Sequence, residues 1–580
     1  MGENGPKLQI REINGHYYAY TSTSTMVDGK KKTINNCVGR WDPETETVIP
    51  KKPRKTKAEY ERIRAEMNPV LDLSRISSRN YGAAHFLDAL QRRMSLGEDL
   101  RRSFGTSAKA ILSCAMALTI NPGPFSSIEG TFECNHLREL YGVEMPVDSR
   151  SMSEFTHSLG KNDPCIDTFF ECRVTRGNGL LAWDTTTNGT YGDLGGMAEW
   201  GASKDEENLK VVKRALATDL RGIPLMYRFY PGSLSDMATI ERLEDDIERY
   251  GRKDCLFVMD RGFGSGSNMH MMIERDRRFV VPAKLDSKAV KAVLTEFRKT
   301  KERNVRVFDG HAYTVWETEI GLKVSDRTNV DGSKAYDMTF VGDEGHGDDG
   351  TMVTYVCYDT KKYSDEVQNR EVMIDSLQEF ARNMDSANPV RDFKKRAGKA
   401  AKYFTIKADG RKVSLTEKNN ARSFSDNRAG IFVMLCSKGI SWELMMAAYD
   451  ARRLVEQVFD TEKEQDRRLR TADPVTLEGR YFIQFIAQIL QAEMKAVLRE
   501  KDADSKYTTE NILATLNTVN VLRYGEQSGL SEITRNVRRI MDLFGMDVPK
   551  TPLFGVEVMD LMNLMAPVPK GEEFLDRLSD

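Results

Sequence analysis

The sequence predicts a multidomain α+β protein, and three observations carry that prediction. The chain has 580 residues, 40% of them hydrophobic, which suits roughly three or four domains of about 150 residues each. Apolar residues recur at helical spacing in some stretches and alternate with polar residues in others. Where the two patterns follow each other closely, they indicate a mixed sheet with helices packed on it.

The N-terminal part predicts two modules. Residues 9–50 alternate polar and apolar side chains, with turn signals at Asp28 and Asp42, and predict a small β module. A basic linker follows at 51–57, and residues 58–175 then show helical spacing. Several short helices after a basic arm favour a DNA-binding module, although an ordinary helical bundle fits the same pattern.

A sheet core is predicted next. It begins with a short strand that ends at Asp184, followed by a hairpin that turns at Gly222 and by a helix. A second apolar strand ends at Asp260, and a helix from about Asn268 and one more strand come after it. Residues 290–430 are β-rich, with one charged helical stretch, and indicate an inserted domain.

A strand and then a long helix from near Ser441 are predicted to belong to the same core as residues 176–290. The rest of the chain, to residue 580, is predicted to be helical. No internal repeat is found. The predicted domains are a β module with its linker, a helical domain expected to bind DNA, the first part of the core, an inserted β-rich domain, the second part of the core, and a helical C-terminal region that is a candidate for dimerisation (1–57, 58–175, 176–290, 291–429, 430–500 and 501–580).

Charge is segregated along the chain rather than present in excess. The net charge is −2, although 30% of the residues are charged. Each basic cluster alone is compatible with a solvated surface, but their recurrence at four places favours a polyanionic partner (51–57, 298–306, 391–402 and 467–470).

Several classes of protein are disfavoured. No apolar run reaches the roughly 18 residues of a membrane span, and the N-terminus lacks an apolar signal core, so a cytoplasmic protein without membrane association is expected. The eight cysteines are scattered, and those in apolar stretches, such as Cys114 and Cys255, are expected to be reduced core thiols. Cys134 and His136 form a close pair, but no second pair lies at zinc spacing.

Two aspartates end predicted apolar strands. Asp184 precedes three threonines, and Asp260 precedes an Arg-Gly pair. A carboxylate at the end of a buried strand is costly to leave unpaired, so it caps a turn, pairs with a base or holds a cation. Because the topology makes the two strands neighbours, a divalent-metal site is as well supported here as two turn caps.

The predicted long helix carries one polar face. Four residues follow one another at steps of three, four and seven, within a sector of about 60°: Tyr449, Arg452, Glu456 and Lys463. The carboxylate suits metal coordination, the two cations suit phosphate oxygens, and the phenol can stack or hydrogen-bond. The plainer alternative is an exposed helix with an ion pair between Arg452 and Glu456.

The spacing of these four residues resembles the Tyr-Arg-Glu-Lys signature of the insertion sequence 4 superfamily of DDE transposases. The strand-borne Asp184, the tripeptide that begins at Asp260 and the segment YPGSLSD around Asp236 are also similar to motifs of that family. Where the family's turn commonly has asparagine, this chain has Ser233, which leaves a polar role of that position open.

The resemblance implies an RNase H-like core and a metal-dependent phosphoryl-transfer enzyme. Its catalytic and metal-binding residues would be Asp184, Asp260 and Glu456, which together would hold two Mg²⁺ or Mn²⁺ ions. Such an enzyme cleaves DNA at the ends of a mobile element and joins the ends to target DNA, in cut-and-paste transposition.

The resemblance also implies DNA contacts and partners. Tyr449, Arg452 and Lys463 would contact DNA, and Trp316 in the inserted domain is a candidate for stacking on a displaced base, although a core tryptophan is the simpler interpretation. The expected partners are double-stranded DNA, as terminal inverted repeats and as target, and a second copy of the chain in a synaptic homodimer. The expected location is the prokaryotic cytoplasm, at the nucleoid when bound to DNA.

Three other functions are compatible with parts of the sequence. The turn GFGSGSN after Asp260 could cradle phosphate, but it lacks the third glycine of the dinucleotide fingerprint and a Gly-Lys-Ser/Thr ending. A host-adapted, non-catalytic DNA-binding protein would be expected to lose active-site acids, and all three acids are present. A structure-specific nuclease with the same core would cleave DNA without strand transfer.

Overall fold

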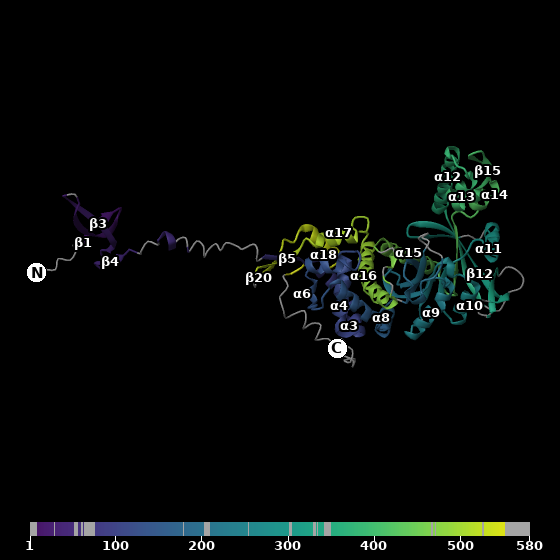
Figure 1. Cartoon of the computed structure of the whole chain (residues 1–580), viewed down its shortest axis with the longest axis horizontal. Coiled ribbons are helices and arrows are strands. Elements are labelled where there is room, and N and C mark those ends of the chain that lie inside the picture. The colour runs from purple at the N-terminus through teal and green to yellow at the C-terminus, as the bar shows by residue number, and fades with distance from the viewer. Residues whose placement is uncertain are drawn as a thin grey trace. The chain divides into compact units, whose positions relative to one another are not determined.

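The structure is a computed structural model with two units, Met1–Ile76 and Ser77–Asp580 (Figure 1). Much of the predicted basic linker, and residues 551–580 of the predicted C-terminal region, lie outside the part of the chain that the structure describes. The described residues are 8–27, 29–51, 56–59, 62, 76–177, 179–201, 209–252, 254–300, 304–328, 332, 334–340, 350–465, 468–469, 471, 473–524 and 527–550.

The first unit is a four-stranded antiparallel sheet. Its strands pair in chain order: β1 (Leu8–Ile13), β2 (His16–Val27), β3 (Lys30–Asp42) and β4 (Thr47–Pro50). The alternating sequence pattern correctly predicts these strands, because successive side chains of a strand point to opposite faces.

All of β5 (Ile76–Asn80) except Ile76 belongs to the second unit, where a group of helices follows it, as the apolar spacing predicts. The helices are α2 (Gly82–Arg93), α3 (Leu96–Phe104), α4 (Ala108–Ile120), α5 (Ser127–Cys134), α6 (Leu137–Tyr141), α7 (Ser149–Gly160) and α8 (Asp163–Arg176). By length and composition alone, the segment Leu96–Ile120 could cross a membrane, because an 18-residue stretch of it has a mean hydropathy of 1.3. Of that stretch, 67% is buried inside the protein. A 3₁₀ turn at Gly105–Ser107 divides this segment into two helices.

The central sheet has the predicted strand order in its first half. β6 (Leu180–Thr190), β7 (Lys210–Thr218) and β8 (Pro224–Pro231) form an antiparallel meander. After α9 (Asp236–Arg249), β9 (Leu256–Met259) adds to β6 in parallel. After α10 (Gly266–Glu274), β10 (Arg278–Pro282) adds to β9, also in parallel. The sheet order here is therefore β10-β9-β6-β7-β8.

The predicted inserted β-rich domain at 291–429 is wrong in its first half. After α11 (Lys288–Lys299), the chain forms β11 (Asn304–Phe308), β12 (His311–Thr328), β13 (Lys334–Phe340) and β14 (Thr351–Asp359). These strands belong to the central sheet, because β14 pairs with β17 (Ile431–Cys436) and β17 pairs with β10. A sequence pattern predicts strands but not the long-range edge on which they pair.

The second half of the insertion has a core of its own and is mainly helical. It contains α12 (Thr360–Asn383), α13 (Pro389–Ala397), a 3₁₀ helix η5 (Gly398–Tyr403), the hairpin β15–β16 (Phe404–Asp409 and Lys412–Glu417) and α14 (Asn419–Asp426). Its buried side chains, Phe393 and Phe404 among them, form a cluster separate from the main core.

The C-terminal part contains two long helices, α15 (Trp442–Gln465) and α16 (Pro474–Glu500), joined through the two-residue strand β18 (Arg468–Leu469). Figure 1 shows α16 between the N-terminal helices and the sheet, and its buried residues cover most of its circumference. The expectation that 501–580 is helical needs correction. Besides α17 (Thr509–Leu516) and α18 (Arg535–Leu543), β19 (Asn520–Tyr524) and β20 (Gln527–Leu530) form a small sheet with β5.

The prediction of core thiols is confirmed for the five buried cysteines, whereas Cys37 and Cys165 are only partly buried. All eight are free, and Cys114 and Cys255 are buried. Burial raises the pKa of the Cys114 thiol to about 12, so that thiol stays protonated at neutral pH. Cys134 is exposed, and among the described residues no group of three His, Cys, Asp or Glu side chains could hold a metal ion.

A partly buried carboxyl between α16 and β8 leads to a prediction for stability. Burial raises the pKa of Glu478 to about 7, and Tyr227 donates a hydrogen bond of 2.7 Å to it. The folded protein therefore holds a proton that the unfolded chain releases at lower pH, so this residue's contribution to stability falls as pH rises from about 4.5 towards 7. We expect Glu478→Gln to raise the melting temperature at pH 8 and to leave it nearly unchanged at pH 4, as differential scanning fluorimetry would show. An equal change at both pH values would contradict this assignment.

Candidate active site

Asp184 lies within its strand rather than at the end of it. β6 continues to Thr190, because the residues after Asp184 pair with β7 as far as Lys210. Asp184 is buried, with 4% of its surface exposed, and its Oδ1 accepts a hydrogen bond of 2.7 Å from Thr185 N. The threonine run after it favours continued β structure, and that signal outweighs the polar aspartate.

Asp260 follows its strand as predicted. It lies directly after β9 and caps the 3₁₀ turn Arg261–Phe263, where its Oδ1 accepts a hydrogen bond of 2.6 Å from Arg261 N. β6 and β9 are parallel, and Trp183 pairs with Met259 in their last register position. Asp184 and Asp260 each follow that pair by one residue, so the two aspartates lie at the same place on adjacent strands.

Helix α15 covers the face of β6 that carries Asp184. Alternate residues of a strand share a face, and the same face includes Arg214 of β7, which lies 5.6 Å from the ring of Phe459 on α15. The apolar side of the helix is buried, with Val455 0% and Phe459 4% exposed. The polar face predicted from spacing therefore borders the two aspartates.

Arg452 bridges the carboxylates. Its Nη1 lies 3.1 Å from Asp260 Oδ1 and 3.0 Å from Glu456 Oε1. Burial alone would lower the pKa of Arg452, but the charges of Asp260, Glu456, Tyr449 and Asp184 outweigh it and raise that pKa. Both carboxylates are about half exposed (45% and 47%), whereas the arginine is largely buried. One cation is thus held between residues that are far apart in sequence.

The remaining predicted DNA contacts are placed differently. Tyr449 stacks on Phe432 of β17, with ring centres 6.0 Å apart, and Arg452 lies 5.8 Å from the Tyr449 ring. Lys463 lies in α15, but its side chain is outside the described part of the structure. Trp316 in β12 packs near Phe297. It lies four strands from β9, which is roughly 19 Å at the usual spacing, so the structure does not bring it to the carboxylates.

Glu199 holds the turn that precedes Asp236, the segment similar to the family's motif, through hydrogen bonds from Ser233. Ser233 donates both its hydroxyl and its backbone N–H to Glu199, and the hydrogen bonds from Ser233 lower the pKa of that carboxyl. Asp236 is the first residue of α9, and its side chain lies outside the described part. Ser233 therefore has a polar role in holding the turn.

Sequence reasoning missed one buried polar residue on the same strand face. Asn188 follows Asp184 by four residues and is 1% exposed, and neither its amide oxygen nor its amide nitrogen has a hydrogen-bond partner. A buried amide without a partner is costly. Counting alternate residues from Asp184 would have found it, had the strand been predicted at its full length.

The Gly-rich turn after Asp260 does not form an open phosphate loop. A Cβ on Gly266 would stand 1.9 Å from the backbone oxygen of Tyr336, so this glycine allows β13 to approach α10. The backbone of β13 thus lies directly against the first residue of α10. This contact disfavours the nucleotide-binding alternative.

The donor set fits a hard divalent cation. Three carboxylates supply only oxygen, the ligand type that Mg²⁺ and Mn²⁺ prefer. In the structure the guanidinium of Arg452 stands between two of these carboxylates, and the three acids do not form a metal cluster among the described residues. The positive charge of Arg452 at this position shows that Asp260 and Glu456 can share a cation.

Removing that charge gives a prediction about metal binding. In Arg452→Gln the carboxylates of Asp260 and Glu456 lose their shared cation, so a divalent ion meets no competitor there. We expect Mg²⁺ to raise the melting temperature of Arg452→Gln more than that of the wild type, because ligands that bind the folded state stabilise it. Arg453→Gln, which loses only an exposed pair with Asp450, is the matched control. Equal Mg²⁺ shifts in all three proteins would contradict a metal site at these acids.

A carboxylate pair on adjacent strands beneath a helix that supplies an arginine and a glutamate is an arrangement suited to phosphoryl transfer. The comparison with known families identifies the class. Residues 176–490 match the family described as "Transposase DDE domain", which is more than half of the chain. The chain therefore belongs to the DDE transposases, and its class is that of a DNA transposase.

Other comparisons add little. No curated protein matches the chain. Among solved structures, the chain is similar to a piggyBac transposase in a synaptic complex with hairpin DNA, determined by cryo-electron microscopy. That similarity has 10% sequence identity and a TM-score of 0.25, and it covers 78% of this chain and 67% of the other.

Proposed function

We propose that the protein is a cut-and-paste transposase of the insertion sequence 4 type, with Asp184, Asp260 and Glu456 as catalytic metal ligands. The observation that carries this proposal is the bridge made by Arg452. One cation joins an acid at the end of β9 to an acid on α15, next to the buried Asp184 of β6. The offsets of the predicted signature fit this geometry, because Arg452 and Glu456 lie on one helix face.

The sheet supports an RNase H-like core. Three antiparallel strands in chain order are followed by two parallel strands on the side of the first, with helices between them. That order places the C-terminal end of β9 beside the middle of β6, where both aspartates lie. The strands β11 to β14 and β17 then extend the same sheet before α15 returns to the site.

The roles of the residues follow from their positions. Asp184, Asp260 and Glu456 would hold two Mg²⁺ or Mn²⁺ ions, which when bound supply activation of a water or 3′-hydroxyl nucleophile and neutralisation of the leaving oxygen. Arg452 offers a fixed guanidinium beside the acids, suited to a phosphate oxygen. Burial of Asp184 excludes water from one side of the site.

A basic surface supports DNA as the partner. Six exposed side chains on α13 and η5 take part in no ion pair among the described residues, and we name them the α13 basic surface: Arg391, Lys394, Lys395, Arg396, Lys399 and Lys402. Several other arginines of the same subdomain are paired, such as Arg411 with Asp385 and Arg422 with Glu371. Unpaired cations gathered on one helix and turn suit a phosphate backbone.

Transposition requires two DNA ends, so we propose a homodimer as the working assembly, acting in the cytoplasm without a membrane. The test uses the purified full chain, Mn²⁺, a linear fragment carrying the DNA that flanks the gene, and a supercoiled target plasmid. Cleavage at both ends with insertion into the plasmid is expected. Cleavage without insertion would indicate a structure-specific nuclease, and binding without cleavage a host-adapted DNA-binding protein. Either result overturns the proposal.

A further inference from the structure

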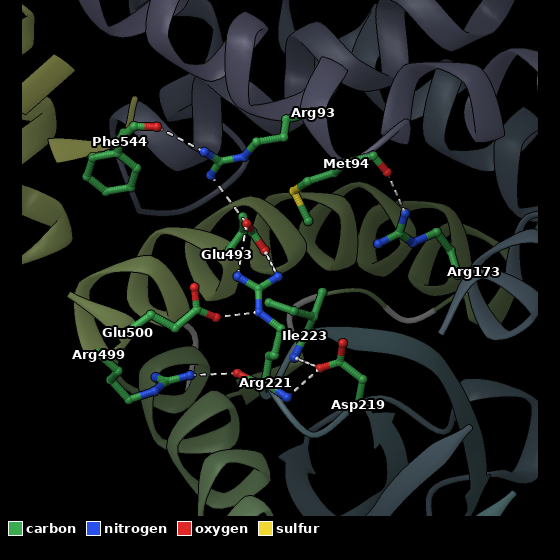
Figure 2. A network of polar contacts seen from close by, with 10 residues as sticks. All are labelled: Arg93, Met94, Arg173, Asp219, Arg221, Ile223, Glu493, Arg499, Glu500 and Phe544. Carbon is green, nitrogen blue, oxygen red and sulfur yellow. Dashed lines mark hydrogen bonds and ion pairs between the residues drawn. The ribbon is translucent and has the colours of Figure 1, made fainter. Parts of the chain in front are cut away.

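A polar network holds the turn between β7 and β8 onto α16 (Figure 2). Arg221 in this turn makes a two-pronged contact with Glu493, through Nη1 at 2.8 Å and Nη2 at 3.2 Å, and its Nε donates to Glu500 at 2.6 Å. Arg499 donates a hydrogen bond of 2.6 Å to the backbone oxygen of Arg221. The Glu493 side chain is 5% exposed, so its negative charge is stabilised by these arginine partners rather than by water.

The turn itself is stiff. Asp219 Oδ1 accepts hydrogen bonds from Arg221 N at 2.9 Å and from Ile223 N at 2.8 Å, and the backbone closes from Gly222 N to Asp219 O at 3.0 Å. Gly222 has a φ of +80°, which favours glycine. A displacement of the Arg221 side chain is therefore passed to the whole turn.

The tip of the turn lies directly against α15. A Cβ on Gly222 would stand 2.7 Å from Leu454 Cβ, which leaves no free space between the turn and the helix. Leu454 lies between Arg452 and Glu456 in sequence, so the turn contacts α15 at the helical turn that carries both residues. At about 100° per residue, Leu454 lies on the side of α15 opposite Arg452 and Glu456, so the Gly222 turn supports the helix from behind the polar face.

We propose that Arg221 and Glu493 are positioning residues for the active site: their ion pair presses the Gly222 turn against Leu454 and so fixes where Arg452 and Glu456 stand. The proposal rests on the proposed function for its chemical consequence. Its structural content, a mechanical contact between the turn and α15, is independent of catalysis.

The same carboxylate also reaches the N-terminal helices. Arg93 of α2 lies 3.3 Å from Glu493 Oε1 through its Nη2, and its Nη1 donates to the backbone oxygen of Phe544 at 3.0 Å. Figure 2 shows Arg93 and Arg221 approaching Glu493 from opposite sides. Through Arg93, Glu493 is linked to the N-terminal helices and to the end of α18. Through Arg221, it is linked to the central sheet.

The first test changes the tip of the turn. Gly222→Ala adds a methyl group against Leu454 and leaves the ion pair intact. Gly251→Ala is the matched control, because Gly251 also has a positive φ, of +73°, but nothing lies within 4 Å of its added Cβ. Both variants carry similar backbone strain, so a difference between them measures the contact with α15.

The second test removes the ion pair. Arg221→Gln abolishes the contact with Glu493 and Glu500. Arg228→Gln on the same hairpin is its control, since Arg228 pairs with Asp167 and Asp246, which lie on α8 and α9. Arg221→Lys keeps the charge but not the two-pronged geometry, and we expect it to recover part of the wild-type behaviour.

Two measurements are made on every variant. Hydrogen–deuterium exchange of peptides from α15 needs no activity, and we expect faster exchange there in Gly222→Ala and Arg221→Gln but not in either control. Titration of DNA-end cleavage with Mn²⁺ should show a loss of about a hundredfold at limiting metal in the same two variants, with DNA binding unchanged, since a displacement of about 1 Å at reacting groups has that effect.

The outcomes separate this proposal from the proposed function. If α15 exchanges at the wild-type rate in both Gly222→Ala and Arg221→Gln, the positioning role is wrong, whatever the cleavage result. If exchange rises in these variants but cleavage keeps its wild-type metal dependence, the contact has no part in catalysis and the proposal also fails. If the wild type itself does not cleave DNA, the proposed function fails while the exchange measurement still decides the contact.

Discussion

Glu456→Gln is expected to lower the rate of DNA-end cleavage by about a thousandfold or more, because it removes a charged metal ligand at the reacting phosphate. Asp184→Asn and Asp260→Asn should have effects of similar size. Binding of the end fragment should stay measurable in all three, since phosphate contacts elsewhere supply most of the affinity. Gel assays of cleavage with Mn²⁺, beside fluorescence anisotropy for binding, would check both expectations.

The control for this prediction is Asp460→Asn. Asp460 lies on the same helix four residues after Glu456 and is exposed. It is also the neighbouring acid that could be mistaken for the third ligand. Wild-type cleavage is expected from Asp460→Asn. Full cleavage by Glu456→Gln together with loss in Asp460→Asn would overturn the assignment of the third acid.

The double variant Lys394→Gln/Lys395→Gln is expected to weaken DNA binding about a hundredfold at low salt, because each lysine of the α13 basic surface would contribute one phosphate contact. The slope of log K against log salt should fall in magnitude by about two. Neither lysine takes part in an ion pair among the described residues, so their removal should leave the fold intact. Anisotropy titrations at several salt concentrations would measure both quantities.

Arg411→Gln is the comparison for the basic surface. Arg411 lies in the same subdomain but is paired with Asp385, and we expect its loss to leave the salt slope almost unchanged. If the double variant and Arg411→Gln change the slope equally, net charge rather than the α13 basic surface governs binding. A double variant with the wild-type slope would exclude DNA contact at this surface.

Local patterns predicted the elements around the site well. The strand, hairpin, helix, strand, helix and strand between 176 and 290 all occur, and α15 begins within a residue or two of Ser441. Periodicity is a property of neighbouring residues, so it identifies strands and helices directly. The pattern is wrong at Asp184, where the polar residue predicts a strand end although the pairing with β7 continues beyond it.

Long-range pairing was less predictable. The β-rich stretch after residue 303 was expected to form a separate domain, yet its strands complete the central sheet through β14 and β17. Strands with open edges pair wherever a compatible edge is available, and the sequence of one strand does not specify that edge. Of the C-terminal strands that the sequence did not predict, β19 pairs with β5, which lies far away in sequence, whereas β20 pairs with β19 in a short local hairpin.

The sequence by itself determined the spacing of Tyr449, Arg452 and Glu456 on one helix face, because helical geometry fixes which residues share a face. Only the tertiary structure decided what that face meets. It placed Asp260 against Arg452 and the Gly222 turn against Leu454. Contacts between residues so far apart depend on how whole elements pack, and packing is settled by the complete core rather than by local pattern.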